Sequence, residues 1–181
     1  DATFKSRGFK PEENQLLVTS GANIQIYLIA ACILNPGDEI IIPDPSFVSY
    51  TSIIKACRGI PRFIPLYESS NFRLEPDLVE KAINLKTKAI IINSPHNPTG
   101  AVMDKERIKK IFKLCQKHGI YLISDEVYGR MIFNDSDAGF YSPAQIDHCK
   151  ERTILVHSFS KTFAMTGWRI GAVTGPEFII N

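Results

Sequence analysis

The chain has 181 residues, of which 44% are hydrophobic and 22% charged, and its formal net charge at pH 7 is +2. This composition is typical of a folded protein and excludes an intrinsically disordered one. The length fits one domain around one core, and so small a net charge gives no indication of a nucleic-acid partner or a membrane surface.

Seven short apolar runs predict β-strands along the chain. Most of them are near-continuous runs of Ile, Val and Leu, which is typical of strands covered on both faces of a sheet. In chain order the runs are Leu16–Thr19, Glu39–Pro43, Ile60–Leu66, Lys88–Asn93, Tyr121–Ser124, Thr153–His157 and Ile170–Thr174.

Longer segments between these strands predict helices. They are Ala22–Leu34, Phe47–Cys57, Glu75–Asn84 and Asp104–His118, with Pro76 near the start of the third and Gly119 after the fourth. The segment Asn134–Lys150 is less regular, and we expect a long loop or excursion there. Alternating strands and helices predict a doubly wound α/β fold.

Polar, small or aromatic residues follow five of the strands, at the point where each strand ends. The carboxyl ends of parallel strands meet at one edge of a sheet, where open α/β proteins bind their ligands. The sequence therefore predicts a binding site at this edge. The five segments are Ser20–Asn23, Asp44–Tyr50, Ser94–Gly100, Asp125–Tyr128 and Ser158–Lys161.

Each of these features also has a purely structural interpretation. Gly21-Ala22-Asn23 is either a tight turn or a helix start whose free N–H groups bind an anion. Asp125 is either a helix cap or a functional carboxylate. Lys161 is either a surface cation or a desolvated lysine that acts as a Schiff-base nucleophile. Arg169 is either an ion-pair partner or a phosphate clamp.

Cysteine and histidine spacing gives no indication of a metal site or a disulfide framework. The four cysteines, at positions 32, 57, 115 and 149, form no Cys-x-x-Cys pair, which favours the reduced thiols of a cytoplasmic protein. The longest apolar stretch, Ile24–Leu34, is too short to span a bilayer. We therefore expect no metal, no membrane and no nucleic acid as partners.

Taken together, these motifs resemble the pyridoxal-phosphate-dependent aminotransferases of fold type I, class I/II. They follow one another in the order and at the separations of that family and cover nearly the whole chain. The matching residues are Gly21-Ala22-Asn23, Pro45–Tyr50, Pro95–Gly100, Asp125–Tyr128, Ser158–Lys161 and Arg169.

The resemblance implies a role for each matched residue near the ring of pyridoxal 5′-phosphate. Lys161 is expected to form the Schiff base with the cofactor aldehyde and then to move a proton at the substrate α-carbon. Asp125 is expected to pair with the pyridinium nitrogen. Tyr128 and Asn97 are expected to hydrogen-bond the ring hydroxyl oxygen, and Phe47 is expected to stack on the ring.

The resemblance also implies a phosphate site. The backbone of Gly21, Ala22 and Asn23, with the side chains of Ser158 and Arg169, is expected to bind the cofactor phosphate. The implied fold is a three-layer α/β/α large domain with a mostly parallel seven-stranded sheet whose last strand is antiparallel.

The implied activity is the transfer of an amino group between an amino acid and a 2-oxo acid. Family members are about twice as long as this chain and usually form homodimers. Residues 1–181 are therefore expected to be a single cofactor-binding large domain, without the N-terminal segment and the C-terminal small domain of the family.

Two other functions are compatible with the same motifs. A lyase on the same scaffold, such as a carbon–sulfur lyase or a cyclopropane-forming synthase, also uses the lysine and the aspartate, although Tyr128 favours an aminotransferase. An aminotransferase-like sensing domain of a transcription regulator is the alternative outside enzymology.

Overall fold

The strands form one seven-stranded sheet in the order β1-β7-β6-β5-β4-β2-β3. The computed structural model describes residues 7–133 and 139–181. The strands are β1 (Leu16–Thr19), β2 (Glu39–Asp44), β3 (Ile60–Pro65), β4 (Thr87–Asn93), β5 (Tyr121–Asp125), β6 (Thr153–Ser158) and β7 (Gly171–Thr174). Each predicted strand is present, with its bounds shifted by no more than one residue.

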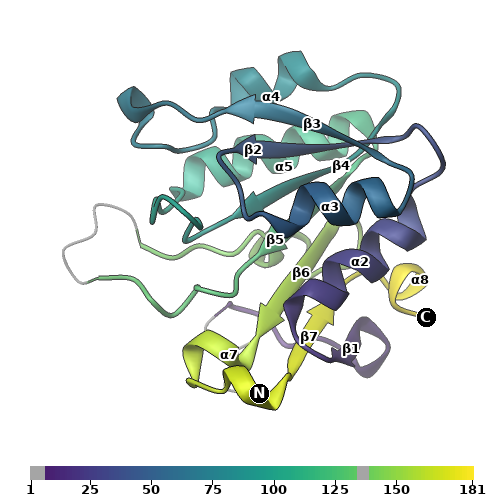
Figure 1. Ribbon diagram of the computed structural model, residues 1–181, viewed down its shortest axis with the longest axis vertical. Helices are drawn as coiled ribbons and strands as arrows, with labels where there is room; N and C mark the ends of the chain where they lie inside the picture. The colour runs from purple at the N-terminus through teal and green to yellow at the C-terminus, as the bar shows by residue number, and fades with distance from the viewer. Residues whose placement is uncertain (1–6, 134–138) are drawn as a thin grey trace.

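Strand β7 is the only strand of this sheet that runs against the others, since it pairs antiparallel with both β1 and β6. The prediction of a mostly parallel sheet with an antiparallel last strand is confirmed. Gly171, the first residue of β7, pairs with Thr19 on one side and with Ser158 on the other. The start of β7 therefore lies at the same edge of the sheet as the carboxyl ends of its two neighbours (Figure 1).

All four predicted helices are present, as α2 (Ala22–Ile33), α3 (Ser49–Ala56), α4 (Pro76–Ala82) and α5 (Lys105–His118). Asp104 caps α5 by accepting a hydrogen bond from the backbone N–H of Arg107 at 2.9 Å, and Gly119 ends it with φ +68°. The second predicted helix begins later than expected, at Ser49, which leaves Phe47 in the turn before it.

Several one-turn elements were not predicted, because four residues are too few to show helical periodicity. They are α6 (Ala144–Asp147), α7 (Phe159–Thr162) and α8 (Glu177–Ile180), with the 3₁₀ turns η1 (Glu13–Gln15), η2 (Glu68–Ser70) and η3 (Thr166–Trp168). The expected excursion Asn134–Lys150 contains α6, while its residues 134–138 lie outside the described part of the chain.

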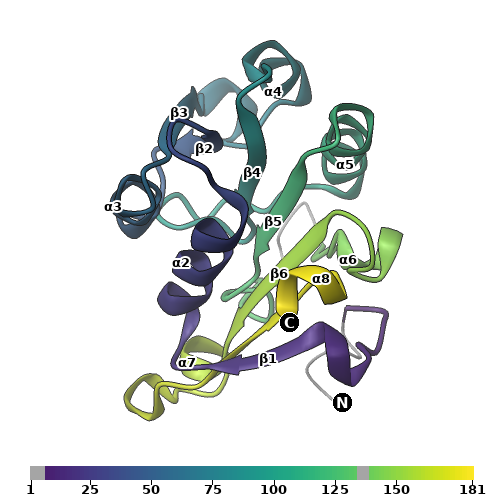
Figure 2. The same cartoon turned by 90° about the vertical axis from the view of Figure 1, so that its right-hand side faces the viewer.

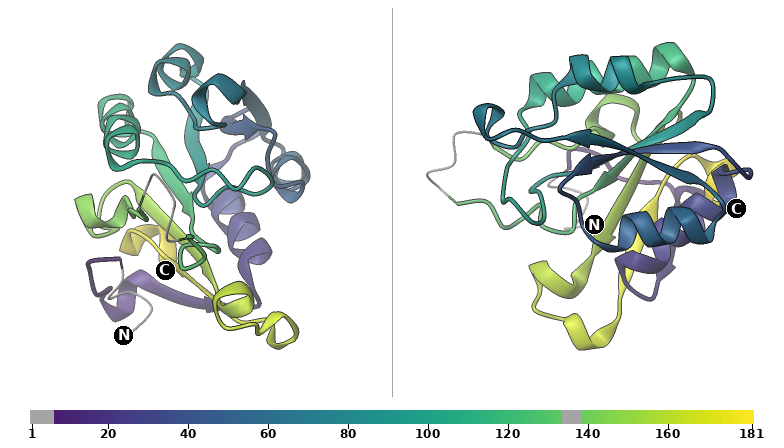
Figure 3. Two further views of the ribbon diagram at one scale, coloured as in Figure 1. Left: turned by 90° about the vertical axis from the view of Figure 1, so that its left-hand side faces the viewer. Right: turned by 45° about the horizontal axis from the view of Figure 1, so that its top comes forward.

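Helices cover both faces of the sheet. Helices α2 and α3 lie on one face, and α5 and α6 lie on the other (Figure 2). In the right-hand view of Figure 3 the teal helix α5 is above the sheet and the purple helix α2 below it. The three-layer α/β/α architecture is therefore confirmed.

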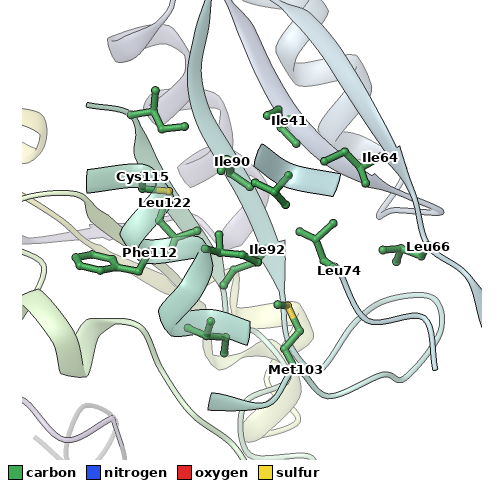
Figure 4. Packing of buried hydrophobic residues seen from close by; sticks show 14 residues of the cluster. Ile41, Ile64, Leu66, Leu74, Ile90, Ile92, Met103, Phe112, Cys115 and Leu122 are labelled. Atoms are coloured by element: carbon green, nitrogen blue, oxygen red, sulfur yellow. The ribbon is translucent and has the colours of Figure 1, made fainter. Parts of the chain in front are cut away.

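Two hydrophobic clusters explain why the central strands carry apolar residues at nearly every position. Along β2, Ile40 and Ile42 pack in the cluster beneath α2 and α3, whereas Ile41 packs in the cluster beneath α4 and α5. Along β4, Ile91 and Ile92 divide between the same two clusters. Figure 4 shows the cluster on the α4 and α5 side. Because both faces of these strands are buried, apolar residues stand at nearly every position and not at every second one, as they would in a half-exposed strand.

In the described ranges, no helix combines the length and the apolar character needed to cross a membrane.

Candidate active site

A cavity of about 290 Å³ lies at the carboxyl edge of the sheet. Its volume is near the lower end of the range for small-molecule sites, about 300–1,000 Å³. Nine of the ten predicted site residues line it, and the tenth, Gly21, directly precedes the lining residue Ala22. The lining residues are Ala22, Asn23, Phe47, Asn93, Asn97, Asp125, Val127, Tyr128, Ser158, Ser160, Lys161, Thr166 and Arg169.

One end of the cavity is built from the start of α2 and the side chain of Arg169. Gly21 precedes the helix with φ +79° and ψ 178°, a conformation that is essentially restricted to glycine. A Cβ atom at this position would overlap the guanidinium of Arg169. Arg169 in turn donates to the carbonyl of Thr166 at 3.1 Å. Free N–H groups at a helix N-terminus beside a guanidinium form an anion site.

Two serines and Lys161 continue this end of the cavity. Ser158, the last residue of β6, accepts a hydrogen bond from the backbone N–H of Ser160 at 3.1 Å and so caps α7. Helix α7 carries Lys161 into the lining of the cavity. The side chain of Lys161 is exposed, which agrees with the surface-cation interpretation and not with the desolvated one. Helix α7 lies beyond the end of β6, and Ser160 is its buried residue.

Asp125 is the buried carboxylate of the cavity. Its Oδ2 accepts a hydrogen bond from the hydroxyl of Tyr50 at 2.6 Å, and its Oδ1 accepts one from the backbone N–H of Val127 at 3.1 Å. Burial raises the pKa of Asp125, and these two hydrogen bonds oppose that rise. Neither partner is a cation, so the site is suited to a positively charged group facing the carboxylate. Asp125 caps the turn at Val127 and not a helix.

Asn97 is held by a neighbour that sequence reasoning missed. Asn93, the last residue of β4, is buried, and its Oδ1 accepts a hydrogen bond from the backbone N–H of Asn97 at 2.8 Å. Its Nδ2 donates to the carbonyl of Asp125 at 3.0 Å. One side chain therefore connects two predicted site segments. A signal was present in the sequence, because Asn93 is a polar residue that closes a strand of three consecutive isoleucines.

Glu126 directly follows Asp125 but is not among the residues that line the cavity. Its Oε2 accepts a hydrogen bond from Nε of Arg7 at 2.6 Å, and its Oε1 accepts from the hydroxyls of Ser124 and Ser142. Both partners of the ion pair are 1% exposed. Burial raises the pKa of Glu126, and Arg7 opposes that rise. These contacts place Glu126 in a buried ion pair and not in the lining of the cavity.

Arg7 also determines the tautomer of a buried histidine. Its Nη2 lies 3.0 Å from Nδ1 of His157, and because a guanidinium only donates, Nδ1 is the acceptor and Nε2 carries the proton. Burial and the charge of Arg7 lower the pKa of His157 to about 3. His157 is therefore a neutral structural histidine.

Gln25 links α2 to the end of β6, a second contact that the sequence did not indicate. Its amide donates to the carbonyl of His157 at 2.9 Å and accepts from the backbone N–H of the same residue at 3.2 Å. It also donates to the hydroxyl of Thr19 at 2.7 Å. A Cβ atom on Gly171 would overlap Gln25 and lie 2.7 Å from the carbonyl of His157. Glycine at that position lets α2 approach the sheet edge.

The remaining predicted residues are half-buried at the rim of the cavity. Phe47 contacts Tyr50 edge to face, with 5.6 Å between the ring centroids, and Tyr128 also lines the cavity. Among the described residues, no group of three His, Cys, Asp or Glu side chains is arranged to hold a metal ion.

The comparisons with known proteins agree with this arrangement. The family model described as "Aminotransferase class I and II" matches residues 3–181. The chain is 44% identical over 170 residues to a probable aspartate/prephenate aminotransferase of Aquifex aeolicus, covering 93% of this chain and 42% of the relative. It is 45% identical over 167 residues to an aspartate aminotransferase of Pyrococcus abyssi, covering 92% and 42%.

A solved structure shows the same fold. The aromatic aminotransferase of Pyrococcus horikoshii matches with a TM-score of 0.92 and 42% identity, over 99% of this chain and 48% of that structure. The chain thus spans less than half the length of the relatives that it matches.

Proposed function

The chain belongs to the class I and II aminotransferase family, and we propose that it is the cofactor-binding large domain of a pyridoxal-5′-phosphate-dependent aminotransferase. The observation that carries this proposal is the convergence of Lys161, Asp125, Asn97 and Tyr128 on one cavity that also contains an anion cradle. The enzyme would transfer an amino group between an amino acid and a 2-oxo acid.

Two features of the cavity fit the cofactor. A phosphate group suits the cradle formed by Gly21, Ala22, Asn23, Ser158 and Arg169, where a Cβ atom at position 21 would displace the guanidinium. A pyridinium suits the buried carboxylate of Asp125, whose two hydrogen-bond partners are both neutral.

When bound, pyridoxal phosphate supplies an aldehyde that condenses with amines and a ring that withdraws electrons. Lys161 would supply the amine that holds the aldehyde carbon, and the same amine would move the proton at the substrate α-carbon. Asp125 would keep a proton on the ring nitrogen. Tyr128 and Asn97 would hydrogen-bond the ring hydroxyl, and Phe47 would pack on the ring.

The substrate is proposed only as a class. The relatives named above act, by their names, on aspartate, prephenate or aromatic amino acids. Because the matched relatives are aminotransferases, they favour transamination over the carbon–sulfur lyase and the cyclopropane-forming synthase. The sensing domain and the cytoplasmic location stay predictions.

We also propose that the whole protein is a homodimer. An apolar groove beside the cavity is lined by residues of α2, of α3 and of the turn before α3, among them Ile24, Tyr27 and Val48, and Val48 is 79% exposed. Apolar surface of this kind marks an interaction site. Sedimentation equilibrium tests the proposal, and a strictly monomeric full-length protein would contradict it.

The central test labels the lysine. We expect the chain mixed with pyridoxal phosphate to show a visible absorption band, and borohydride to fix the cofactor on the peptide that contains Lys161. Lys161→Ala should lose the reducible link, whereas Lys113→Ala, an exposed position on α5, should keep it. A label on another lysine, or a link that survives Lys161→Ala, contradicts the proposal.

A second measurement separates transamination from elimination. With the full-length protein, L-aspartate or L-phenylalanine should move the visible band into the near ultraviolet and release one equivalent of the 2-oxo acid. Release of ammonia with repeated turnover would instead support a lyase.

A further inference from the structure

The hydroxyl of Tyr50 makes the shortest hydrogen bond that the structure gives to Asp125. Tyr50 lies on α3 and is 1% exposed, and its Oη donates to Oδ2 of Asp125 at 2.6 Å. Tyr50 belongs to one of the matched motifs, yet neither the sequence nor the proposed chemistry gives it a role. Its contact is with the carboxylate and not with the open part of the cavity, because Tyr50 is absent from the cavity lining.

Both oxygens of Asp125 are held, and from two different elements. Tyr50 on α3 binds Oδ2, and the backbone N–H of Val127 in the turn after β5 binds Oδ1 at 3.1 Å. Two donors on different oxygens set the orientation of the carboxylate plane. They also stabilise the ionised form, which burial alone would disfavour.

We propose that Tyr50 is a positioning residue that keeps the Asp125 carboxylate ionised and oriented for the cofactor ring nitrogen. This inference rests on the proposed function, in which Asp125 pairs with that nitrogen. Burial and the charge of Asp125 raise the pKa of Tyr50 well above its usual value, so the phenol is protonated at neutral pH and donates the hydrogen bond.

The positioning role can be separated from the packing role of the same side chain. The ring of Tyr50 packs edge to face on Phe47, with a centroid distance of 5.6 Å and an interplanar angle of 75°. A phenylalanine at this position keeps the ring and its contact with Phe47. Only the hydroxyl, and with it the bond to Asp125, is lost in Tyr50→Phe.

The test compares two cofactors on the intact chain. Pyridoxal phosphate has the ring nitrogen, and 1-deazapyridoxal phosphate has a C–H group in its place. We expect Tyr50→Phe to weaken binding of pyridoxal phosphate about tenfold, the usual cost of losing a hydrogen bond to a charged group. Binding of the deaza analogue should change by less than about twofold, because that analogue has no nitrogen for Asp125 to bind.

Two further variants complete the design. Tyr121→Phe, at the opposite end of β5 from Asp125, should leave the affinity for both cofactors unchanged. In the Asp125→Asn background, Tyr50→Phe should cause no additional loss of affinity for pyridoxal phosphate. Circular dichroism of each variant without cofactor reports its folding.

The outcomes are distinct. Equal losses for the two cofactors would mean that the hydroxyl is only structural, and an unchanged affinity for pyridoxal phosphate would mean that it has no part in binding. Either result overturns the inference while the proposed function stands. If the unsubstituted chain forms no borohydride-reducible link, the proposed function itself fails, and this inference fails with it.

Discussion

The guanidinium of Arg169 occupies the space in which a side chain on residue 21 would lie. Gly21 precedes α2 and Arg169 follows η3. Two segments far apart in the sequence are therefore packed together at the proposed phosphate site. Absence of a Cβ atom is therefore a requirement of the site as well as of the turn.

Gly21→Ala should weaken both folding and cofactor binding. With φ +79° and ψ 178°, an alanine costs about 1–3 kcal/mol of unfolding free energy, and its methyl group displaces Arg169. Urea denaturation measures the first effect, and titration with pyridoxal phosphate measures the second.

Gly37→Ala is the matched control. Gly37 has φ +86°, but nothing lies within 4 Å of a Cβ atom there. This variant should lose stability and keep its affinity for pyridoxal phosphate. Equal affinities in the two variants would show that the contact with Arg169 has no part in binding.

Asn93→Ala should disconnect the segments of Asn97 and Asp125. The change removes both hydrogen bonds of the Asn93 side chain and leaves the backbone N–H of Asn97 without its partner, at a cost of about 2 kcal/mol of unfolding free energy. The carbonyl of Asp125 keeps the hydrogen bond that it accepts from the backbone N–H of Ser94 at 3.2 Å. Affinity for pyridoxal phosphate should fall together with stability. Asn84→Ala, three residues before the start of β4, removes a hydrogen bond to Glu39 and should lower stability alone.

The role of Asn93 was not predictable from the sequence, and the reason is general for this site. Strand positions were predictable, because continuous apolar runs mark strands covered on both faces. Which side chains meet at the sheet edge depends on the spatial order of the strands, which places β4 between β5 and β2. Asn93 bonds to Asp125 because β4 and β5 are neighbours in the sheet. Tyr50 reaches Asp125 from α3, the helix that follows β2.

The sequence left two interpretations of Lys161 open, a surface cation and a desolvated lysine. The structure places it on a one-turn helix beyond the sheet, where its side chain is exposed. The residues that surround the cavity were nonetheless predictable, since they follow strands whose carboxyl ends had to meet. Their chemical roles stay predictions until the cofactor experiments are done.

Glu126→Gln should strongly destabilise the protein. The substitution leaves Arg7 buried without its carboxylate, and breaking a buried pair in this way costs about 3–5 kcal/mol of unfolding free energy. Urea denaturation measures the loss. Glu106→Gln removes an exposed pair with Lys109 and should cost less than about 1 kcal/mol. Similar losses of unfolding free energy in both variants would contradict the conclusion that burial makes the Arg7–Glu126 pair costly to break.

His157 should make stability fall in mild acid. Its pKa is about 3 in the folded protein against 6.5 for an unperturbed histidine, so below pH 6.5 the unfolded chain binds a proton that the folded chain does not. Stability is therefore retained above pH 6.5 and decreases as the pH falls toward 3, by about 2 kcal/mol at pH 5.

His157→Asn isolates this contribution, since asparagine keeps an acceptor for Arg7 and does not titrate. The variant should lose less stability than the unsubstituted chain between pH 7 and pH 5, as measured by urea denaturation at each pH. His148→Asn, at an exposed position, should retain the original dependence. Parallel pH profiles for His157→Asn and the unsubstituted chain would refute the assignment.

The insertion of β7 between β1 and β6 determines when the site can form during folding. Segments that line the cavity come from Ala22 to Arg169. The start of α2 bonds to the end of β6 through Gln25, beside Gly171 at the start of β7. The strands from β2 to β6 are adjacent through parallel crossovers and can associate earlier. The anion cradle therefore depends on contacts of high sequence separation, which form slowly. The cofactor would bind only after β7 has paired with its neighbours in the sheet. Bound pyridoxal phosphate would therefore report that the chain has folded as far as this last strand.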